Sequence, residues 1–265
     1  MYKRRSSLMQ YHSDNIWALV TGASDGIGKA IALELSSRGF KVILHGRNRT
    51  KLEAVAKELK GETKIFVMDG SNFSRNDIDR MKQELQSLEI GILINNVSIA
   101  NDFQTLDELS LENIDSVLRL NISFVTHLNR IILSCLKRQR HSLIITIGSY
   151  TGIHPPGILS IYASSKSFQH SLSESLRREA PPGMRVELHL AGSVISSSNR
   201  AAQSFLRPTS AMFATAVCDH VGAANIIAPY WPHAILIWLF GIMPTSWIDF
   251  ISGKVTAVMK DGKNN

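Results

Sequence analysis

Tyr162 and Lys166 stand four residues apart in a segment whose apolar spacing predicts a helix. Side chains four positions apart emerge on the same face of a helix, so the two groups are expected to lie together. An ammonium beside a phenol stabilises the phenolate, and a free phenol titrates near about 10. We therefore predict that Lys166 lowers the pKa of Tyr162 and that the pair performs general acid–base chemistry.

Ser149 directly follows a strand-like apolar run and precedes this pair in the chain. A serine hydroxyl at the carboxyl end of a strand can orient a substrate carbonyl for proton transfer. Serine in such a position is also a common turn residue, and a Tyr–Lys pair alone arises often on helices. The combination in this order favours a catalytic site formed by Ser149, Tyr162 and Lys166.

The segment from Thr21 to Gly28 is a glycine-rich turn between the first predicted strand and the first predicted helix. Glycines permit a tight turn and let backbone N–H groups approach a phosphate, and the helix N-terminus adds the positive end of its dipole. An ordinary glycine-rich turn is the alternative. The placement after the first strand favours dinucleotide binding, with contacts expected from Gly22, Ser24, Asp25, Gly26, Ile27 and Gly28.

The residues after the second predicted strand distinguish NADP from NAD. Arg47 and Asn48 stand there, and no acid is present. In dinucleotide-binding sheets an acid at this point binds the ribose hydroxyls, whereas an arginine accommodates the 2′-phosphate. We expect Arg47 and Asn48 to bind NADPH; an arginine capping a solvated loop is the alternative. Asp69, after the third strand, either holds the adenine amino group or satisfies its own loop backbone.

These residues belong to alternating strand-like and helix-like segments, which predict a single-domain, doubly wound parallel α/β sheet, the Rossmann fold. Ligands of such sheets bind beyond the carboxyl ends of the strands. The expected strands are 16–20, 41–45, 64–68, 91–94, 143–147 and 185–190. The expected helices are 27–38, 51–59, 76–88, 111–138 and 160–180, followed by 209–221.

Three parts of the chain are expected to differ in role. They are a basic N-terminal arm (1–15), a dinucleotide-binding and catalytic region (16–195), and a substrate loop with a hydrophobic helical extension (196–265). The apolar residues of 223–250 either complete the core or form an exposed surface for a membrane or a partner subunit. Because three tryptophans occur there with several prolines, we predict a non-spanning element that contacts lipid peripherally.

Composition narrows the class of protein. The chain has 265 residues, 44% of them hydrophobic, which is enough for a full core. Its formal net charge is +7, but the basic residues are dispersed along predicted helices, so we expect solvated faces and no nucleic-acid partner. Only Cys135 and Cys218 are present, which favours a reducing compartment. With no signal-peptide pattern, we expect a cytoplasmic location, peripheral at the endoplasmic reticulum membrane, and we expect no metal.

The glycine turn, the Asn95-Asn96 pair, Asn121, Ser149 and the Tyr162-Ala-Ser-Ser-Lys166 run together resemble the short-chain dehydrogenase/reductase family. The resemblance covers roughly residues 16–200. It implies that the tyrosine is the general acid or base and that the lysine lowers its pKa, assisted by the oxidised nicotinamide ring, and holds the nicotinamide ribose. It also implies that the serine orients the carbonyl and that Asn121 holds a water of the proton relay.

The same resemblance implies further contacts and an assembly. Asn95 would line the cofactor cleft, and Val194 and Ser196 would meet the nicotinamide carboxamide. The chain would form a homodimer or homotetramer that packs through helices 111–138 and 160–180.

The segments Ser24–Ala30, Tyr230–Ala234 and Pro244–Ile248 resemble one branch of the family, which contains the 17β-hydroxysteroid dehydrogenases of types 3 and 12 and the very-long-chain 3-oxoacyl-CoA reductases. Those are NADPH enzymes that act on lipids. Ser98 and Ala191 replace the family's usual glycine and proline, but no catalytic group is lost. We expect no N-terminal hydrophobic anchor of the kind found in the branch's membrane proteins.

We therefore predict an NADPH-dependent ketoreductase that transfers a hydride to the carbonyl of a bulky hydrophobic substrate, such as a steroid, a 3-oxoacyl compound or a secondary-metabolite ketone. One alternative is an alcohol dehydrogenase that works oxidatively on a similar substrate. The other is a dinucleotide-binding regulator that has kept the fold without the activity, because a fold alone does not guarantee catalysis.

Overall fold

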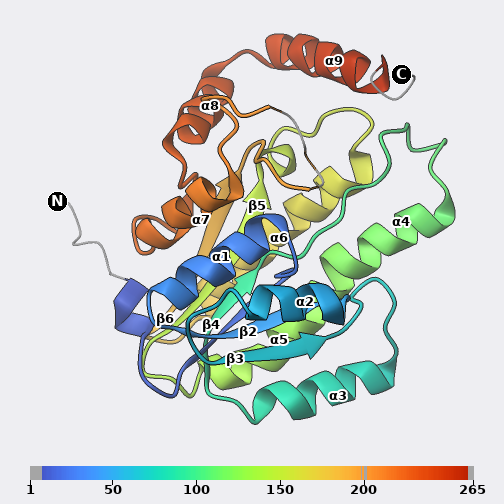
Figure 1. Cartoon of the computed structure of the whole chain (residues 1–265). Helices are drawn as coiled ribbons and strands as arrows, with labels where there is room; N and C mark the ends of the chain where they lie inside the picture. The colour runs from blue at the N-terminus through green and yellow to red at the C-terminus, as the bar shows by residue number, and fades with distance from the viewer. Residues whose placement is uncertain (1–7, 198, 200–201, 262–265) are drawn as a thin grey trace.

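The computed structural model describes residues 8–197, 199 and 202–261. Its centre is a seven-stranded parallel sheet with the order β3-β2-β1-β4-β5-β6-β7 (Figure 1). The order reverses between β1 and β4, which is where ligands of doubly wound sheets bind. The strands are β1 (Trp17–Thr21), β2 (Lys41–Gly46), β3 (Thr63–Val67), β4 (Ile90–Asn95), β5 (Ser142–Ser149), β6 (Met184–Ala191) and β7 (Ile226–Ile227).

Both faces of the sheet are covered by helices, so the expected α/β fold is confirmed. Helices α1 (Gly26–Ser37), α2 (Arg49–Ala56) and α7 (Ser210–Asp219) contribute to one hydrophobic cluster. The helices α3 (Arg75–Gln86), α5 (Val125–Leu136) and α6 (Ser160–Glu179) contribute to the other. Successive strand residues alternate between the two clusters, as Leu19 and Val20 do with no exposure. Strands buried on both faces explain the continuous apolar runs of the sequence.

The predicted helix over 111–138 is correct in extent but not uniform. It consists of α4 (Leu111–Leu118), one π-helical turn η2 (Arg119–Phe124) and α5. A π-turn inside an α-helix frequently marks a functional site. Here the widened turn contains Asn121, which has no exposed surface.

The C-terminal part follows the predicted helix with a short strand and two more helices. Strand β7 pairs in parallel with β6 and was not predicted. Helices α8 (Trp231–Ile242) and α9 (Thr245–Asp261) then form the end of the molecule at the top of Figure 1. Pro232 lies in the first turn of α8 and Pro244 immediately precedes α9, so both prolines occupy positions where no backbone donor is needed.

Within the described residues, no helix combines the length and the apolar character that crossing a membrane requires. At the other end of the chain, the short 3₁₀-helix η1 (Leu8–Tyr11) buries Leu8 and Tyr11 in the core. The basic residues of the expected N-terminal arm, Lys3, Arg4 and Arg5, lie outside the described residues.

Candidate active site

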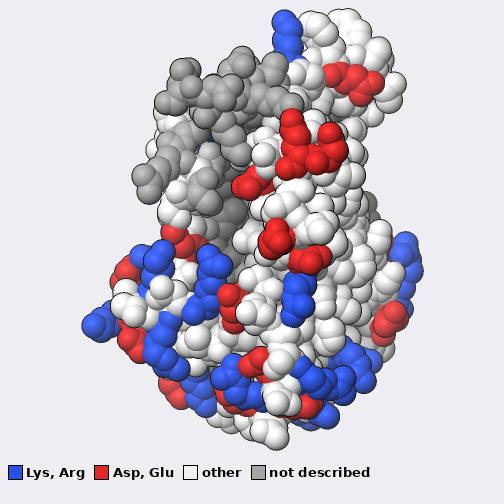
Figure 2. All heavy atoms as spheres, turned by 90° about the vertical axis from the view of Figure 1, so that its right-hand side faces the viewer, with Lys and Arg blue, Asp and Glu red and all other residues white. Residues whose placement is uncertain are grey.

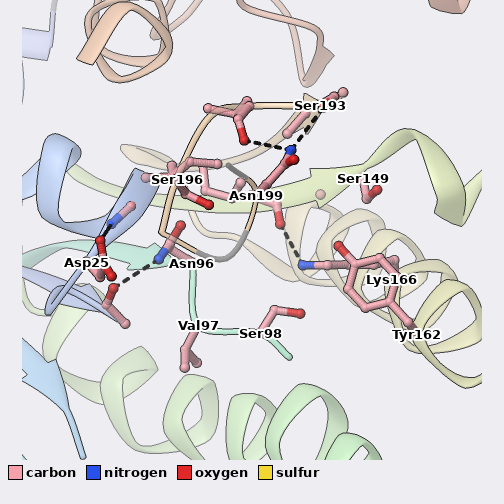
Figure 3. Close-up of a pocket in the computed structure, with 18 of the residues that line it drawn as sticks. Asp25, Asn96, Val97, Ser98, Ser149, Tyr162, Lys166, Ser193, Ser196 and Asn199 are labelled. Atoms are coloured by element: carbon pink, nitrogen blue, oxygen red, sulfur yellow. Dashed lines mark hydrogen bonds between the residues drawn. The ribbon is translucent and has the colours of Figure 1, made fainter. Parts of the chain in front are cut away.

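A cavity of about 340 Å³ opens at the carboxyl ends of β1, β4, β5 and β6. The glycine turn forms one side of it, and Tyr162 and Lys166 of α6 form the opposite side (Figure 3). Its lining includes nine of the predicted site residues: Gly22, Asp25, Gly26, Ile27, Ser149, Tyr162, Lys166, Val194 and Ser196. We refer to this space as the cofactor cleft.

The glycine turn brings backbone close to the cleft. Gly22 and Gly26 have φ values of +65° and +55°, which residues with a Cβ rarely adopt. A Cβ at Gly28 would lie 2.2 Å from the carbonyl oxygen of Gly22, so only glycine fits there. The N-terminus of α1 therefore points its N–H groups at a surface free of side chains, the arrangement that suits a phosphate.

Asp25 begins α1 and ties the turn to the substrate loop. Its side chain accepts from the backbone N–H of Gly26 at 2.6 Å and from the hydroxyl of Ser197. The hydrogen bond from Ser197 holds the pKa of Asp25 below its usual value. Ser24, by contrast, is absent from the lining, and its Oγ lies near Gly46 at the end of β2.

Asn96, rather than Asn95, faces the cleft. Its side chain donates to the carbonyl of Thr21 at 2.9 Å and its backbone N–H donates to the Thr21 hydroxyl at 2.9 Å. Asn95 points the other way: it is 4% exposed and donates to Asn129 at 3.0 Å on α5. The place in the cleft lining that was expected for Asn95 is therefore taken by Asn96. The sequence signal was ambiguous, because adjacent strand residues point to opposite faces.

Lys166 is buried beside Tyr162, as their spacing predicted. Its ammonium is 5.8 Å from the centre of the Tyr162 ring, and the residue is only 3% exposed. The Nζ atom donates to the carbonyl of Ile147 at 3.0 Å and to the side chain of Gln169 at 3.1 Å. Both hydrogen bonds hold the ammonium at the wall of the cleft.

The pKa values of the pair differ from the prediction. Burial raises the pKa of the Tyr162 phenol, and a hydrogen bond with Ser149 offsets only part of this. Burial also lowers the pKa of Lys166 to about 8. The net direction is therefore opposite to the one predicted, because burial favours the neutral phenol. The share of the lowering assigned to the oxidised nicotinamide ring stays a prediction. Tyr162 keeps its proton near neutral pH.

Ser149 ends β5 and lines the cleft. Its hydroxyl shares a hydrogen bond of 2.8 Å with the Thr151 hydroxyl and accepts from the Thr151 backbone N–H at 3.2 Å. It thereby begins the short helix η3 (Tyr150–Gly152). Ser149 is therefore both a turn residue and a neighbour of Tyr162. Its contacts with Thr151 orient the hydroxyl that lines the cleft.

Asn121 is completely buried and joins three parts of the site. Its side chain accepts from the backbone N–H of Ile99 at 3.0 Å and donates to the Ile99 carbonyl at 2.8 Å. It also donates to the hydroxyl of Ser165 on α6 at 2.9 Å. Its backbone carbonyl accepts from the Gln169 side chain at 2.8 Å. The described partner of this carbonyl is thus a side-chain amide from α6, and the water that the family resemblance implied at Asn121 stays a prediction.

The residues expected to select NADP lie outside the cleft lining, after β2 and β3. Arg47 is exposed. Against the effect of burial, hydrogen bonds from Ser71 and then the charge of Arg47 hold the pKa of Asp69 below its usual value. Asn48 accepts from the backbone N–H of Lys51 at 3.0 Å and so begins α2. Asp69 accepts from the backbone N–H and the hydroxyl of Ser71, at 2.9 and 2.7 Å. Asp69 therefore bonds to its own loop through Oδ1, and its expected contact with the adenine amino group stays a prediction.

Two positioning residues escaped the sequence analysis. Gln169 bridges Lys166 and Asn121, as described above. Asn101 is 2% exposed, accepts from the backbone N–H of Tyr162 at 3.0 Å and donates to the carbonyl of Ile158 at 3.0 Å. Ile158 has a φ of +56°, which is costly for a β-branched residue, so Asn101 holds a strained turn directly before the catalytic helix. Gln169 and Asn101 were not predicted because neither belongs to a recognisable sequence motif.

A family model described as short chain dehydrogenase matches residues 16–205. The chain belongs to this family. The expected branch is confirmed as well, because curated very-long-chain 3-oxoacyl-CoA reductases are similar over most of the chain. That of Anas platyrhynchos is 36% identical and covers 88% of this chain and 77% of its own length. That of Podospora anserina is 33% identical, with 88% and 73% covered.

Solved structures of the short-chain dehydrogenase family show the same fold. A 7β-hydroxysteroid dehydrogenase superposes with a TM-score of 0.82 at 18% identity, covering 94% of this chain and 100% of that chain. A short-chain dehydrogenase from Sphingobium yanoikuyae, solved in complex with NADPH, superposes with a TM-score of 0.72 at 23% identity. It covers 92% of this chain and 95% of that chain.

Proposed function

We propose that this short-chain dehydrogenase is an NADPH-dependent ketoreductase that transfers a hydride to the carbonyl of a bulky hydrophobic substrate. One observation carries the proposal: Tyr162, Lys166 and Ser149 line the same cleft as the Gly22–Gly26 turn. A dinucleotide on the turn and a carbonyl beside Tyr162 would therefore meet in one space. The two relatives reported above are both named very-long-chain 3-oxoacyl-CoA reductases, which supports the same reaction.

The residues of the cleft fit the cofactor. The turn at Gly22 and Gly26 offers backbone donors to a diphosphate, and the lack of space at Gly28 keeps the approach free of side chains. The exposed guanidinium of Arg47 would bind the 2′-phosphate, with Asn48 and Asp69 on the adenosine side. Val194 and Ser196 would face the nicotinamide carboxamide. When bound, NADPH supplies the hydride.

The protein supplies the proton. Burial raises the pKa of Tyr162, so the phenol keeps its proton and can give it to the carbonyl oxygen as the hydride arrives. Ser149 hydrogen-bonds Tyr162 and would hold the carbonyl oxygen within reach of the phenol.

Two apolar cavities extend the cofactor cleft toward the C-terminal helices. The inner cavity, of about 140 Å³, shares Gly192 and Ser193 with the cleft. The outer cavity, of about 390 Å³, lies between η3 and α8–α9 and shares Tyr150 and Phe240 with the inner one. We propose that the apolar part of the substrate runs through these two cavities. A long acyl chain or a fused ring system would match their size and lining.

The substrate proposal is tested by NADPH oxidation with a panel of ketones: 3-oxoacyl thioesters of increasing chain length, steroid ketones and small polycyclic ketones. We expect kcat/KM to rise with apolar size until the outer cavity is filled. The matched control is Tyr162→Phe, which should bind NADPH without turnover. Wild-type protein that binds NADPH but reduces no ketone would contradict the proposal and favour a dinucleotide-binding regulator.

We also propose that α8 and α9 rest on a lipid bilayer, which would place the protein peripherally at the endoplasmic reticulum membrane. Helix α8 contains no charged residue, yet Trp238 and Ile242 are each 63% exposed. On α9, Trp247 and Phe250 are 66% and 64% exposed. In Figure 2 charged side chains of both signs gather at the end of the molecule opposite these helices. Exposing these large apolar side chains to water is unfavourable, whereas the interface of a bilayer stabilises them.

Vesicle co-sedimentation tests this contact. Wild-type protein should pellet with phosphatidylcholine–phosphatidylethanolamine vesicles, and a variant with Trp238→Ser and Ile242→Ser should remain largely in solution. Both substituted side chains are exposed, so NADPH binding and thermal stability should be unchanged in the variant. Wild-type protein that stays in the supernatant at every vesicle concentration would exclude the membrane proposal.

We further propose that the chain assembles as a homodimer or homotetramer through α4–α5 and α6, as the family resemblance implies. Large apolar side chains are exposed on these helices: Leu111 is 75%, Leu118 is 37% and Phe168 is 36% exposed. This surface is separate from that of α8–α9, so assembly and membrane contact need not compete. Light scattering of the purified protein measures the assembly directly.

A further inference from the structure

Gln169 occupies an unusual position on α6. It is 3% exposed, and both ends of its amide are used: Oε1 accepts from the Lys166 ammonium at 3.1 Å, and Nε2 donates to the Asn121 carbonyl at 2.8 Å. Glutamine is seldom this deeply buried without a reason, because an unpaired amide costs free energy in the interior. Here every contact of the amide connects it to the proposed catalytic residues.

The two partners of Gln169 require opposite polarities. An ammonium can only donate and a backbone carbonyl can only accept, so the group between them must accept on one side and donate on the other. A water molecule meets this requirement, and so does a primary amide. Unlike water, the amide is fixed to α6 and keeps one orientation. Gln169 therefore sets the position of the Lys166 head as well as filling the space between the two groups.

We propose that Gln169 is a positioning residue that holds the Lys166 ammonium against the cofactor cleft. The inference rests on the proposed ketoreductase function for its kinetic consequence, but the bridge itself can be tested without turnover. Lys166 has two described hydrogen bonds, and the one to Ile147 is fixed by the backbone of β5. Gln169 is thus the side chain through which the position of the ammonium can be altered.

The surroundings of Lys166 allow its titration to be observed separately. Among the described residues, the titratable groups that interact with it are Tyr162 and His170, both on α6. Burial and the Lys166 charge lower the pKa of His170 to about 4, and burial raises that of Tyr162. The elements packed against α6 contribute titratable side chains that are exposed or have other partners: Glu112, Asp115, Arg119, Tyr150, Arg185, Glu187 and His189.

The test compares Gln169→Leu and Gln169→Glu with wild type in protein labelled with ¹³C-lysine. The resonance of Lys166 is assigned by its loss in Lys166→Met, and its titration midpoint is followed by NMR. Leucine removes the acceptor, so the midpoint should fall by about one pH unit, whereas glutamate adds a charge and should raise it by about one unit. The alkaline limb of kcat/KM should move in the same direction in each variant.

Ser173→Ala is the matched control. Ser173 is also buried on α6, one turn further along, but its hydroxyl bonds to Thr146 at 3.1 Å and not to a catalytic residue. This variant loses a buried hydrogen bond of similar kind, so it should change stability without moving the Lys166 midpoint. A shift that appeared equally in Ser173→Ala would show that general loosening of α6 is responsible and would overturn the proposal.

The outcomes separate this inference from the proposed function. Midpoints of both Gln169 variants that coincide with wild type would overturn the positioning role, whatever the turnover. Midpoints that move as expected in a protein that reduces no ketone would retain the positioning role and remove the proposed function. If Gln169→Leu does not fold, the Gln169→Glu variant decides the question, because glutamate keeps the acceptor for the Lys166 ammonium although it removes the donor to the Asn121 carbonyl.

Discussion

In the cofactor cleft polar side chains are buried and hydrogen-bonded, whereas on helices α8 and α9 large apolar side chains are exposed. Asn121 has no exposed surface and makes three side-chain hydrogen bonds, while Trp238 on α8 is 63% exposed. In the cleft, neighbouring strands and α6 fix each group before any ligand arrives. On α8 and α9, the described apolar side chains extend beyond what the core can cover.

The contrast shows two ways in which an apolar sequence can be used. In β1, β4 and β5 apolar residues are buried and hold the catalytic groups in fixed positions. In α8 the same kinds of residue divide between two environments, because Phe240 packs 5.0 Å from the ring of Tyr150 while Trp238 is exposed. Substitutions in the cleft should therefore change turnover. Substitutions on α8 should change substrate access to the cavities or contact with a membrane.

The largest effect is expected from Tyr162→Phe. Removing the phenol hydroxyl should lower kcat by about two to four orders of magnitude, the usual loss for a positioned general acid. NADPH affinity, measured by fluorescence titration, should be unchanged because the ring and Lys166 remain. A Phe variant that kept more than half of the wild-type turnover would remove Tyr162 from the mechanism.

A pH dependence of stability should follow from Lys166. Its pKa in the folded state is lowered from 10.5 to about 8, so between these values the unfolded state holds a proton that the folded state has lost. Stability then rises with pH in this window, and the burial penalty is fully present below about pH 8. We expect wild type to gain about 2 kcal/mol in unfolding free energy between pH 8 and about pH 9.5, relative to Lys166→Met. Equal slopes in urea unfolding of both proteins would contradict this.

Cofactor preference should change by about tenfold in Arg47→Ala, the value of one charge-assisted contact with a 2′-phosphate. The measurement is the ratio of kcat/KM for NADPH and NADH. Arg49→Ala is the control, because Arg49 is a nearby arginine on α2 whose described ion pair is with Glu53. Equal use of both cofactors by the wild type would refute the role of Arg47.

The smallest effect distinguishes the two sides of α8. Phe240→Ala should raise KM for the bulkiest ketone by about fivefold, because it removes apolar contact worth about 1 kcal/mol from both substrate cavities. Vesicle binding should be unchanged. The variant with Trp238→Ser and Ile242→Ser should show the reverse pattern. If both variants lost vesicle binding, or both raised KM, the two sides of α8 would not have separate roles.

The sequence predicted the fold more completely than it predicted the properties of the site. The six predicted strands were found within a residue or two, because strands buried on both faces give unbroken apolar runs. The glycine turn and the Tyr162–Lys166 pair were located by local spacing, which the backbone of a turn or a helix translates directly into geometry. The direction of the Tyr162 pKa was wrong, because the spacing of two residues says nothing about how deeply both are buried.

The sequence by itself determined the order of strands and helices, the turn that requires glycine at position 28, and the helix face shared by Tyr162 and Lys166. These depend on neighbours along the chain. Only the tertiary structure decided that Asn96 faces the cleft in place of Asn95, that Gln169 connects Lys166 to Asn121, and that Phe240 packs inward while Trp238 is exposed. Those outcomes depend on which elements meet in space, and burial and hydrogen-bond partners exist only once the chain has folded.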